Sequence, residues 1–484
     1  MALSAARNQL KQSNFLINDN EERFSFFDHS YKNYKPFSRL TKQLNFDSKL
    51  DFGKTVRVNL SENGNYGDLI TQITVKVKVP DISSVAGNFG YTNGFCHALF
   101  ESIELKIDGT LIDKQTSEWM DIWSELTIKP GLQKNYDYLV KKFDGVFHTN
   151  FQGGFAYLPL HFWFCRGSSS NNSQNNLAFP LASLYNSNVE LIFKTRTLAQ
   201  TTINKRQNTT AISSNLSIEE GNLLIDYIVL DESDLAEMQR KDINKYFLIS
   251  QVQEIERNIP ASTTKKVFVF KEFKYIVSEL LWVVISKSSQ SNKLFFDYAT
   301  ISSNKRIDPI KTTKIKFDGV DRVEELPSEY FQSVEPLTVH DNTPFSFIHC
   351  YSFSLKPEDY SQPSGICNFS EIHNTEIEMT FEDGINESIL KLFALNYNIL
   401  IVNNGKGRLL NSLGKSSSTT NPKNNERRAN NSNSNSNSNS NSNSNSNFNS
   451  NSNSNFNSKK KENTPNKNSK KPNKPKNNSD LECY

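Results

Sequence analysis

Strict alternation of apolar and polar side chains is the feature that most restricts the fold of this chain. Residues 69–79 place Ile73, Val75, Val77 and Val79 on one face and Thr74, Lys76 and Lys78 on the other. Residues 103–107 repeat the pattern over a shorter length. Successive side chains of a strand point to opposite faces, so this spacing predicts strands with one buried and one solvated face.

A tight turn joins residues 103–107 to the next apolar pair, Leu111 and Ile112. Asp108 and Gly109 stand between them, and both residue types tolerate the positive φ of a type I′ hairpin turn. Further strand patterns follow at residues 267–273, 280–285, 315–317, 345–355, 376–381 and 392–402. All-β content with connections of varied length favours sandwiches or jelly rolls over an up-and-down barrel or a βαβ fold.

Two short helices interrupt the strands. Trp119, Ile122, Trp123 and Leu126 are spaced i, i+3, i+4 and i+7, which predicts a helix with one apolar face that caps a barrel edge. Residues 231–241 begin with acidic side chains and end with basic ones, an order that the helix dipole favours. The second helix marks the junction between two β-rich halves of similar size.

The expected organisation therefore has five parts. An extended N-terminal arm at residues 1–45 precedes a first jelly roll at 46–230. A linker helix at 231–245 leads to a second jelly roll at 246–414, and a disordered tail rich in Asn, Ser and Lys occupies 415–484. The predicted fold class is all-β, with two tandem antiparallel sandwiches and a few short helices.

The tail differs from the rest in composition and charge. Asn and Ser alternate from Asn431 onward, and a run of Lys, Pro and Asn follows from Lys459. Twelve Lys and Arg against four Asp and Glu come after Gly414, so the tail carries +8 and leaves −5 on the body of a chain with net charge +3. The tail has too little apolar surface to offset the entropy lost on ordering. The nearly neutral body argues against a nucleic-acid-binding fold.

Cysteine usage and hydropathy restrict the compartment. The five cysteines are odd in number and widely spaced, which fits a reducing environment better than a disulfide framework. No apolar run approaches the roughly 18 residues of a membrane span, and the N-terminus has no apolar signal core. We therefore expect a soluble protein that is made in the cytoplasm.

Two segments near the end of the body are the most informative motifs. Residues 351–374 comprise a strand, a loop with Pro363 and Gly365, and another strand, and residues 395–402 form a long apolar strand. Nine further segments precede them along the chain, at 52–57, 67–70, 93–98, 103–109, 112–114, 118–126, 158–164, 177–181 and 226–231. Together they closely resemble the double jelly-roll major capsid proteins of nucleocytoplasmic large DNA viruses, the group that includes iridoviruses, phycodnaviruses and mimiviruses. The arm and the tail depart from the family pattern and receive no role from it.

The resemblance implies a structural protein of the virion and no enzyme activity or cofactor. It implies a homotrimeric capsomer of pseudo-hexagonal outline that tiles an icosahedral shell, assembled in the host cytoplasm. Neighbouring capsomers and minor capsid or cement proteins would be its partners. The basic tail is interpreted first as a solvated spacer, next as an attachment to an anionic inner membrane or an acidic partner. Genome binding ranks last, because these viruses generally place a membrane between shell and DNA, and no direct nucleic-acid contact is expected.

Two pairs of histidine and cysteine are close enough in sequence to be considered as metal ligands. His161 and Cys165 are four residues apart, and Cys367 and His373 are six apart, but no second pair has the spacing of a zinc finger. If residues 161–165 form a strand, positions 161, 163 and 165 share one face. His349 is in phase with neighbouring aromatic residues, which favours a core or interface histidine whose burial would make stability pH-sensitive. The sequence predicts no metal site.

Catalytic patterns are equally weak. Cys96 and His97 would point to opposite faces of a strand, and no Gly-x-Ser-x-Gly elbow occurs. Acidic clusters at residues 219–220, 231–234 and 324–325 are typical of solvated faces. Gly405 and Gly407 lack the third glycine and following helix of a dinucleotide loop, so a turn is expected there. No catalytic residue is predicted.

Asparagine sequons are numerous, as chance predicts in so Asn-rich a chain. They include those that begin at Asn59, Asn171, Asn208, Asn215, Asn368, Asn386 and Asn430. Without a secretory signal, ordinary N-glycosylation is not expected. If a glycan is present, Asn171 in the loop at residues 167–176 is the favoured acceptor.

Three other classes of protein were compared with the capsid interpretation. A carbohydrate-binding β-sandwich would carry Asp-rich calcium loops, whereas the Asp residues here are scattered. A hydrolase would need converging His and carboxylate groups, and the seven histidines share no motif. A minor capsid protein usually has a single barrel, so two barrels disfavour it.

Overall fold

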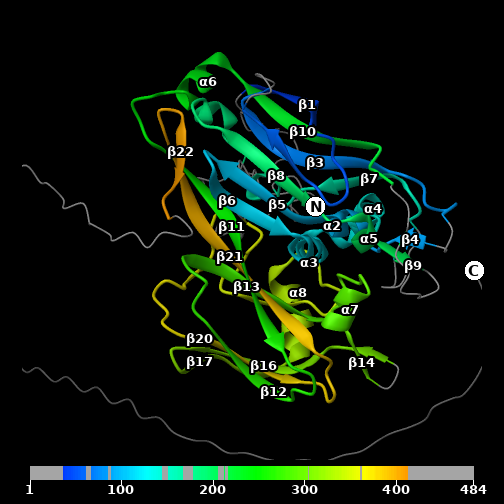
Figure 1. The fold of residues 1–484 in the computed structure, drawn as a ribbon. Coiled ribbons are helices and arrows are strands. Elements are labelled where there is room, and N and C mark those ends of the chain that lie inside the picture. Colours follow the sequence, from blue (N-terminus) through cyan, green and yellow to red (C-terminus); the bar gives the residue numbers. More distant parts are fainter. Residues whose placement is uncertain are drawn as a thin grey trace, which may run out of the picture. The chain divides into compact units, whose positions relative to one another are not determined.

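The computed structural model describes residues 36–61, 67–85, 89–143, 151–166, 178–204, 212, 216–302, 305–359 and 362–411 (Figure 1). The predicted tail at 415–484, most of the predicted arm and Asn171 lie outside these residues. In the described part of the chain, no helix is both long enough and apolar enough to cross a membrane.

Residues 37–230 form two four-stranded antiparallel sheets. The first has the order β1 (Phe37–Asn45), β10 (Glu220–Leu230), β3 (Leu69–Val79) and β7 (Gly154–Pro159). The second has the order β2 (Thr55–Asn59), β8 (Val189–Thr195), β5 (Phe100–Ile107) and β6 (Thr110–Thr116). A separate pair joins β4 (Phe89–Tyr91) and β9 (Thr202–Asn204).

Residues 245–409 form a second pair of sheets. One has the order β11 (Lys245–Ile259), β21 (Ser388–Asn403), β13 (Ile276–Ser286) and β18 (His349–Ser352), with β19 (Cys367–Asn368) beside β13 and β22 (Lys406–Leu409) beside β21. The other has the order β12 (Lys265–Phe270), β20 (Thr375–Phe381), β16 (Ile310–Phe317) and β17 (Val320–Pro327). β14 (Thr300–Ser302) pairs with β15 (Lys305–Ile307).

The two halves share one topology. In each half, the first strand pairs with the last long strand, which then pairs with the third (β1-β10-β3 and β11-β21-β13). The second sheet of each half also has one order. The second strand (β2 or β12) pairs with a later strand (β8 or β20), and that later strand pairs with the first strand of a hairpin (β5-β6 or β16-β17). This exchange of strands between two facing antiparallel sheets is the jelly-roll arrangement, and it occurs twice.

Short helices occupy the connections. They are α2 (Phe95–Leu99), α3 (Ser117–Thr127), α4 (Pro130–Val140), α5 (Leu198–Thr201), α6 (Glu232–Met238), α7 (Lys287–Ser291) and α8 (Glu335–Val339). Single turns of other helix types lie at η3 (Trp163–Cys165), η4 (Leu181–Leu184) and η5 (Tyr330–Val334). Both predicted helices are present, and the Asp231 side chain caps α6 by accepting a hydrogen bond from Ser233 N.

Each sandwich encloses its own apolar core. The alternating residues of β3 place Ile73, Val75 and Val77 in the first core with no exposed surface. In β13, Leu280, Trp282 and Val284 face the second core, while the intervening Leu281, Val283 and Ile285 face a third cluster. Because both faces of β13 are covered, its sequence is a continuous apolar run and does not alternate.

The Asp108-Gly109 hairpin is confirmed, since both residues have positive φ, at 48° and 77°. Three local predictions need correction. Residues 37–45 of the predicted arm form β1, which pairs along its whole length with β10. Residues 163–165 form a 3₁₀ turn, so positions 161, 163 and 165 are not on one strand face. The strand predicted at 345–355 is limited to His349–Ser352.

Candidate functional site at the junction of the two barrels

Helix α3 joins the first barrel to the second. Its apolar residues Trp119, Ile122, Trp123 and Leu126 belong to a cluster with the second-barrel residues Leu281, Val283, Ile285, Phe393 and Leu395. Trp119 and Trp123 stack with centroids 5.1 Å apart, and the Trp119 ring lies 5.7 Å from that of Phe393. The predicted helix is therefore correct, and its apolar face lies in the seam between the barrels.

The hairpin of β21 and β22 also contacts the first barrel. Asn404 and Gly405 form its turn with φ of 48° and 77°, as the sequence predicted for this segment. The backbone N–H of Asn186 donates to the Gly405 carbonyl at 3.1 Å. Gly405 has a positive φ, and a Cβ there would lie 2.9 Å from the backbone nitrogen of Asn186, so the close approach of these two segments favours glycine at this position.

Buried polar groups cross the same seam. Asp113 of β6 accepts a hydrogen bond from the backbone N–H of Val252 on β11 at 3.0 Å. The Gln251 side chain donates to the Ile112 carbonyl. Burial raises the pKa of Asp113 to about 6, because the charged form loses water that these contacts only partly replace.

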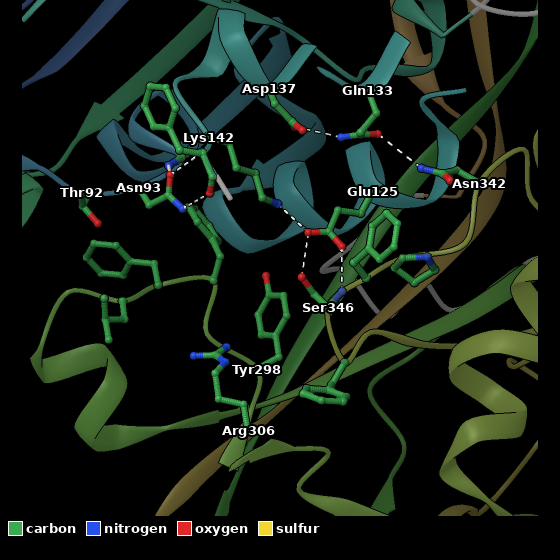
Figure 2. Close-up of a pocket in the computed structure, with 18 of the residues that line it drawn as sticks. Thr92, Asn93, Glu125, Gln133, Asp137, Lys142, Tyr298, Arg306, Asn342 and Ser346 are labelled. Atoms are coloured by element: carbon green, nitrogen blue, oxygen red, sulfur yellow. Dashed lines mark hydrogen bonds and ion pairs between the residues drawn. The ribbon is translucent and has the colours of Figure 1, made fainter. Parts of the chain in front are cut away.

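A cleft of about 360 Å³ opens beside the seam, with walls from both barrels (Figure 2). Figure 2 shows Lys142, Glu125 and Ser346 directed toward one another. Lys142 Nζ lies 2.6 Å from Glu125 Oε1, and the Ser346 hydroxyl donates to the same oxygen at 2.8 Å. Gln133 donates to Asp137 at 3.0 Å and accepts from Asn342 at 3.4 Å.

The charges behind the cleft are also paired. Asp121 of α3 is fully buried, lies 2.6 Å from Lys142 Nζ and accepts from the Tyr298 hydroxyl at 3.1 Å. Burial would raise the pKa of Asp121, but Lys142 outweighs that effect and holds the pKa below its usual value. The arrangement suits a fixed bridge between barrels, because the Lys142 charge is neutralised by carboxylates of its own barrel that also bind the second barrel.

The two first-barrel histidines that were considered for catalysis or metal binding both contact the hydroxyl group of one tyrosine. The Tyr136 hydroxyl lies 2.9 Å from His97 Nε2 and 2.8 Å from His161 Nε2. Burial lowers the pKa of both histidines, that of His161 to about 3, so both are neutral at pH 7. Cys96 lies on α2 with a thiol pKa raised to about 12 by burial, which makes it a poor nucleophile. Cys165 is likewise a buried free thiol.

The histidines and the cysteine of the second barrel that were considered as metal ligands do not form one site. His373 is 92 % exposed and lies 3.7 Å from Asp318, whereas Cys367 lies in β19. His349 is buried, lies 2.8 Å from Asp308 Oδ2 and stacks on Trp282. The interpretation of His349 as a core histidine is confirmed.

The acidic residues at 219–220 and Glu325 lie beside lysines or a hydroxyl group. Glu219 lies 2.8 Å from Lys78 and Glu220 lies 2.5 Å from Lys76. Glu325 accepts from the Thr312 hydroxyl at 2.7 Å. Within the described residues, these carboxylates are part of solvated strand faces.

One grouping was missed from the sequence. Glu279, His340 and Cys350 place a ligand atom each within 4.8 Å of one another beneath α3. Their separations of 61 and 10 residues match no motif. The available signal was a single acidic residue inside the apolar strand at residues 276–286.

Comparison with known protein families covers both barrels. A family profile described as "Major capsid protein N-terminus" matches residues 25–231, and one described as "Large eukaryotic DNA virus major capsid protein" matches residues 238–407. The boundary between the two matches falls at α6, the predicted junction.

Individual relatives agree with the profiles. The major capsid protein of Pyramimonas orientalis virus is 29 % identical over 415 residues, covering 80 % of this chain and 93 % of the relative. That of Paramecium bursaria Chlorella virus 1 is 26 % identical over 437 residues, covering 80 % and 94 %.

Solved structures show the same fold. A chain of the PBCV-1 virus capsid superposes with a TM-score of 0.66 at 23 % identity, covering 80 % of this chain and 100 % of that chain. The Faustovirus major capsid protein superposes with a TM-score of 0.62 at 11 % identity, covering 78 % and 93 %.

The strand order, repeated in two barrels of one chain, defines a protein of the double jelly-roll class. The chain belongs to the major capsid proteins of large eukaryotic DNA viruses. This is a family of structural proteins of the virion shell and not a class of enzymes.

Proposed function

We propose that this capsid protein forms a homotrimeric capsomer of pseudo-hexagonal outline and that many such capsomers tile an icosahedral shell. The supporting observation is the repeat of one strand order in two barrels of the same chain. Three chains with two similar barrels each supply six similar units around a threefold axis. Such a body approximates a hexagon and packs with few gaps.

The junction described above supports this function mechanically. A capsomer transmits load between barrels, so the two barrels of a chain must keep a fixed relation. The α3 cluster, the β21–β22 hairpin and the buried charges at Asp121 and Lys142 all cross or support that junction. Close packing of this kind resists deformation because protein interiors have low compressibility.

Exposed apolar side chains support contacts between chains. Phe345 is 97 % exposed, Leu355 79 %, Leu337 74 % and Val320 71 %. Apolar side chains this exposed are available for contacts with other chains, where their burial would be favourable. We assign them to contacts within or between capsomers.

Light scattering on the purified protein, coupled to size exclusion, tests the trimer. Three chains of 55.2 kDa give an expected mass of about 165 kDa for a closed C₃ assembly. The mass should stay constant on dilution through the micromolar range. A persistent single-chain mass at micromolar concentration would overturn the proposal.

Further proposals concern the partners of the capsomer, its place of assembly, the parts of the chain and one glycan acceptor. We propose neighbouring capsomers and minor capsid or cement proteins as partners, with assembly in the host cytoplasm. We also propose five parts to the chain as expected from the sequence, with the first barrel extended to include β1. Asn171 remains the proposed glycan acceptor, and intact-mass and peptide mass spectrometry of virion protein would test it.

A further inference from the structure

Three side chains from separate segments converge beneath α3. Glu279 lies on β13, Cys350 on the adjacent β18 and His340 directly after α8. Cys350 is opposite Leu281 in the strand register, so Glu279, two residues away, is on the same face of the sheet. One ligand atom from each lies within 4.8 Å of the others.

One buried oxygen in this group has no partner. The Glu279 and His340 side chains are 0 % exposed, and Cys350 is also 0 % exposed. Glu279 Oε1 lies 2.6 Å from His340 Nε2, but Glu279 Oε2 has no hydrogen-bond partner among the residues the structure describes. An unsatisfied buried acceptor costs about 1–3 kcal/mol, more for a charged group, so such a group in a native protein needs an explanation, for example an ordered water or a bound ion.

The orientation of His340 matches that of a metal-bound histidine. Its Nδ1 lies 2.8 Å from Glu358 Oε1, on the side opposite Nε2. That carboxylate oxygen also accepts from the backbone N–H of Asp341 at 2.9 Å, which fixes its position. Metal-ligating histidines typically donate their second N–H to a carboxylate in this way, which sets the tautomer and the ring direction.

An imidazolium held between two carboxylates explains only part of this arrangement. It accounts for Oε1 of Glu279 and of Glu358, and the Cys350 side chain also makes a hydrogen bond with His340, but Glu279 Oε2 is left without a partner. A cation beside Nε2 would use the carboxylate, the imidazole and the sulfur together. Thiolate, imidazole and carboxylate are the donors that zinc takes in proteins, whereas calcium and magnesium prefer oxygen alone.

We propose that Glu279, His340 Nε2 and Cys350 Sγ bind one divalent transition-metal ion, with Zn²⁺ as the ion that best fits these donors. Binding requires the Cys350 thiolate and the neutral imidazole of His340, so their protons are released to solvent as the metal bonds form. Glu279 Oε2 or a water molecule completes the coordination. The Glu358 side chain, 20 % exposed, marks the route from solvent.

The ion would act as a staple at the junction of the barrels. It would tie β13, β18 and the segment after α8, directly below α3. The His340 ring packs edge-on against Trp123 of α3, with centroids 6.1 Å apart. The site lies within one chain, so its occupancy does not depend on the proposed trimer.

Metal content of the full-length chain tests the proposal. After treatment with a chelator, incubation with Zn²⁺ and desalting, we expect about one zinc per chain by mass spectrometry of the metal. Cys350→Ser and His340→Gln should each reduce zinc below about one-tenth per chain. The matched control is Cys165→Ser, which removes another buried free thiol near a histidine and should keep full occupancy.

Cobalt gives a readout that does not depend on the variants folding. Co²⁺ added to the wild-type chain should produce thiolate-to-metal charge-transfer absorption, which Zn²⁺ should abolish by competition. The proposal is overturned if the wild-type protein retains no zinc, if Co²⁺ gives no thiolate band, or if Cys350→Ser binds as much zinc as Cys165→Ser.

Discussion

Lys391 on β21 lies 3.3 Å from the Glu118 carboxylate on α3, and the two side chains are only 8 % and 5 % exposed. The same ammonium group lies 3.2 Å from Glu254 and 2.8 Å from Glu256 on β11. Burial lowers the pKa of Lys391, but the carboxylates raise it by more, so the group stays charged. One cation therefore neutralises carboxylates from both barrels at their junction.

Lys391→Met should strongly destabilise the chain. Removing the cation leaves Glu254 without its counter-charge and leaves Glu118 with Arg196 alone, 4.0 Å away, and breaking a buried pair in this way costs about 3–5 kcal/mol. The free energy of unfolding, measured by chemical denaturation, checks this. The control is Lys287→Met, because Lys287 and Glu387 pair at 2.5 Å but are 38 % and 58 % exposed. The control should lose less than about 1 kcal/mol, and equal losses for the two variants would contradict the argument.

The elements that could be predicted from the sequence are those with one covered face. The alternation at residues 69–79 gave the bounds of β3, and the i, i+3, i+4 spacing gave α3. The fifteen-residue strand β11 was missed because its polar side chains interrupt the pattern. Gln251, for example, is 0 % exposed and donates to Ile112 of the first barrel. Contacts between barrels therefore hide the period that a half-buried strand would show.

The junction and the proposed metal site could not be predicted, since both depend on register. Glu279 and Cys350 become neighbours only because Leu281 pairs with Cys350 across β13 and β18. His340 reaches them from the end of α8, which the sequence analysis did not predict. The sandwich topology brings these distant residues together, so their spacing in the sequence does not predict that they are neighbours.

Acid should destabilise the first barrel through His161. Its pKa is about 3 in the folded chain against an ordinary 6.5, because burial disfavours the imidazolium. Between these values the unfolded chain binds a proton that the folded chain does not, so stability falls as pH decreases from 6.5 toward 3. One such group contributes up to about 1.4 kcal/mol per pH unit.

His161→Gln should flatten this dependence by about that slope, measured as the free energy of unfolding at several pH values between 4 and 7. His373→Gln is the control, because His373 is 92 % exposed and its replacement should leave the slope unchanged. An identical slope in wild-type protein and His161→Gln would contradict the assignment.

Gly365→Ala should destabilise the second barrel. A Cβ at this position would lie 2.2 Å from the Phe353 carbonyl oxygen and 2.9 Å from Ser354 Cα, and both are backbone atoms that cannot move alone. Forcing an extra group into a packed site typically costs about 1–3 kcal/mol. The melting temperature should fall accordingly. Gly131→Ala in α4 is the control, because no atom lies within 4 Å of its added Cβ. The control should be neutral or stabilising by up to about 1 kcal/mol, since alanine favours helix.

Deleting residues 416–484 should leave the capsomer assembled. The matches to capsid families end at residue 407, and both sandwich cores are complete by Leu409. The tail is rich in Asn, Ser and Lys, so it offers little apolar surface for a contact between chains. Light scattering of the truncated protein should give a mass near three truncated chains at the same concentrations as the full-length protein. Dissociation into single chains would show that the tail carries a contact that holds the trimer together, and the role of a spacer or an attachment to an anionic surface would have to be abandoned.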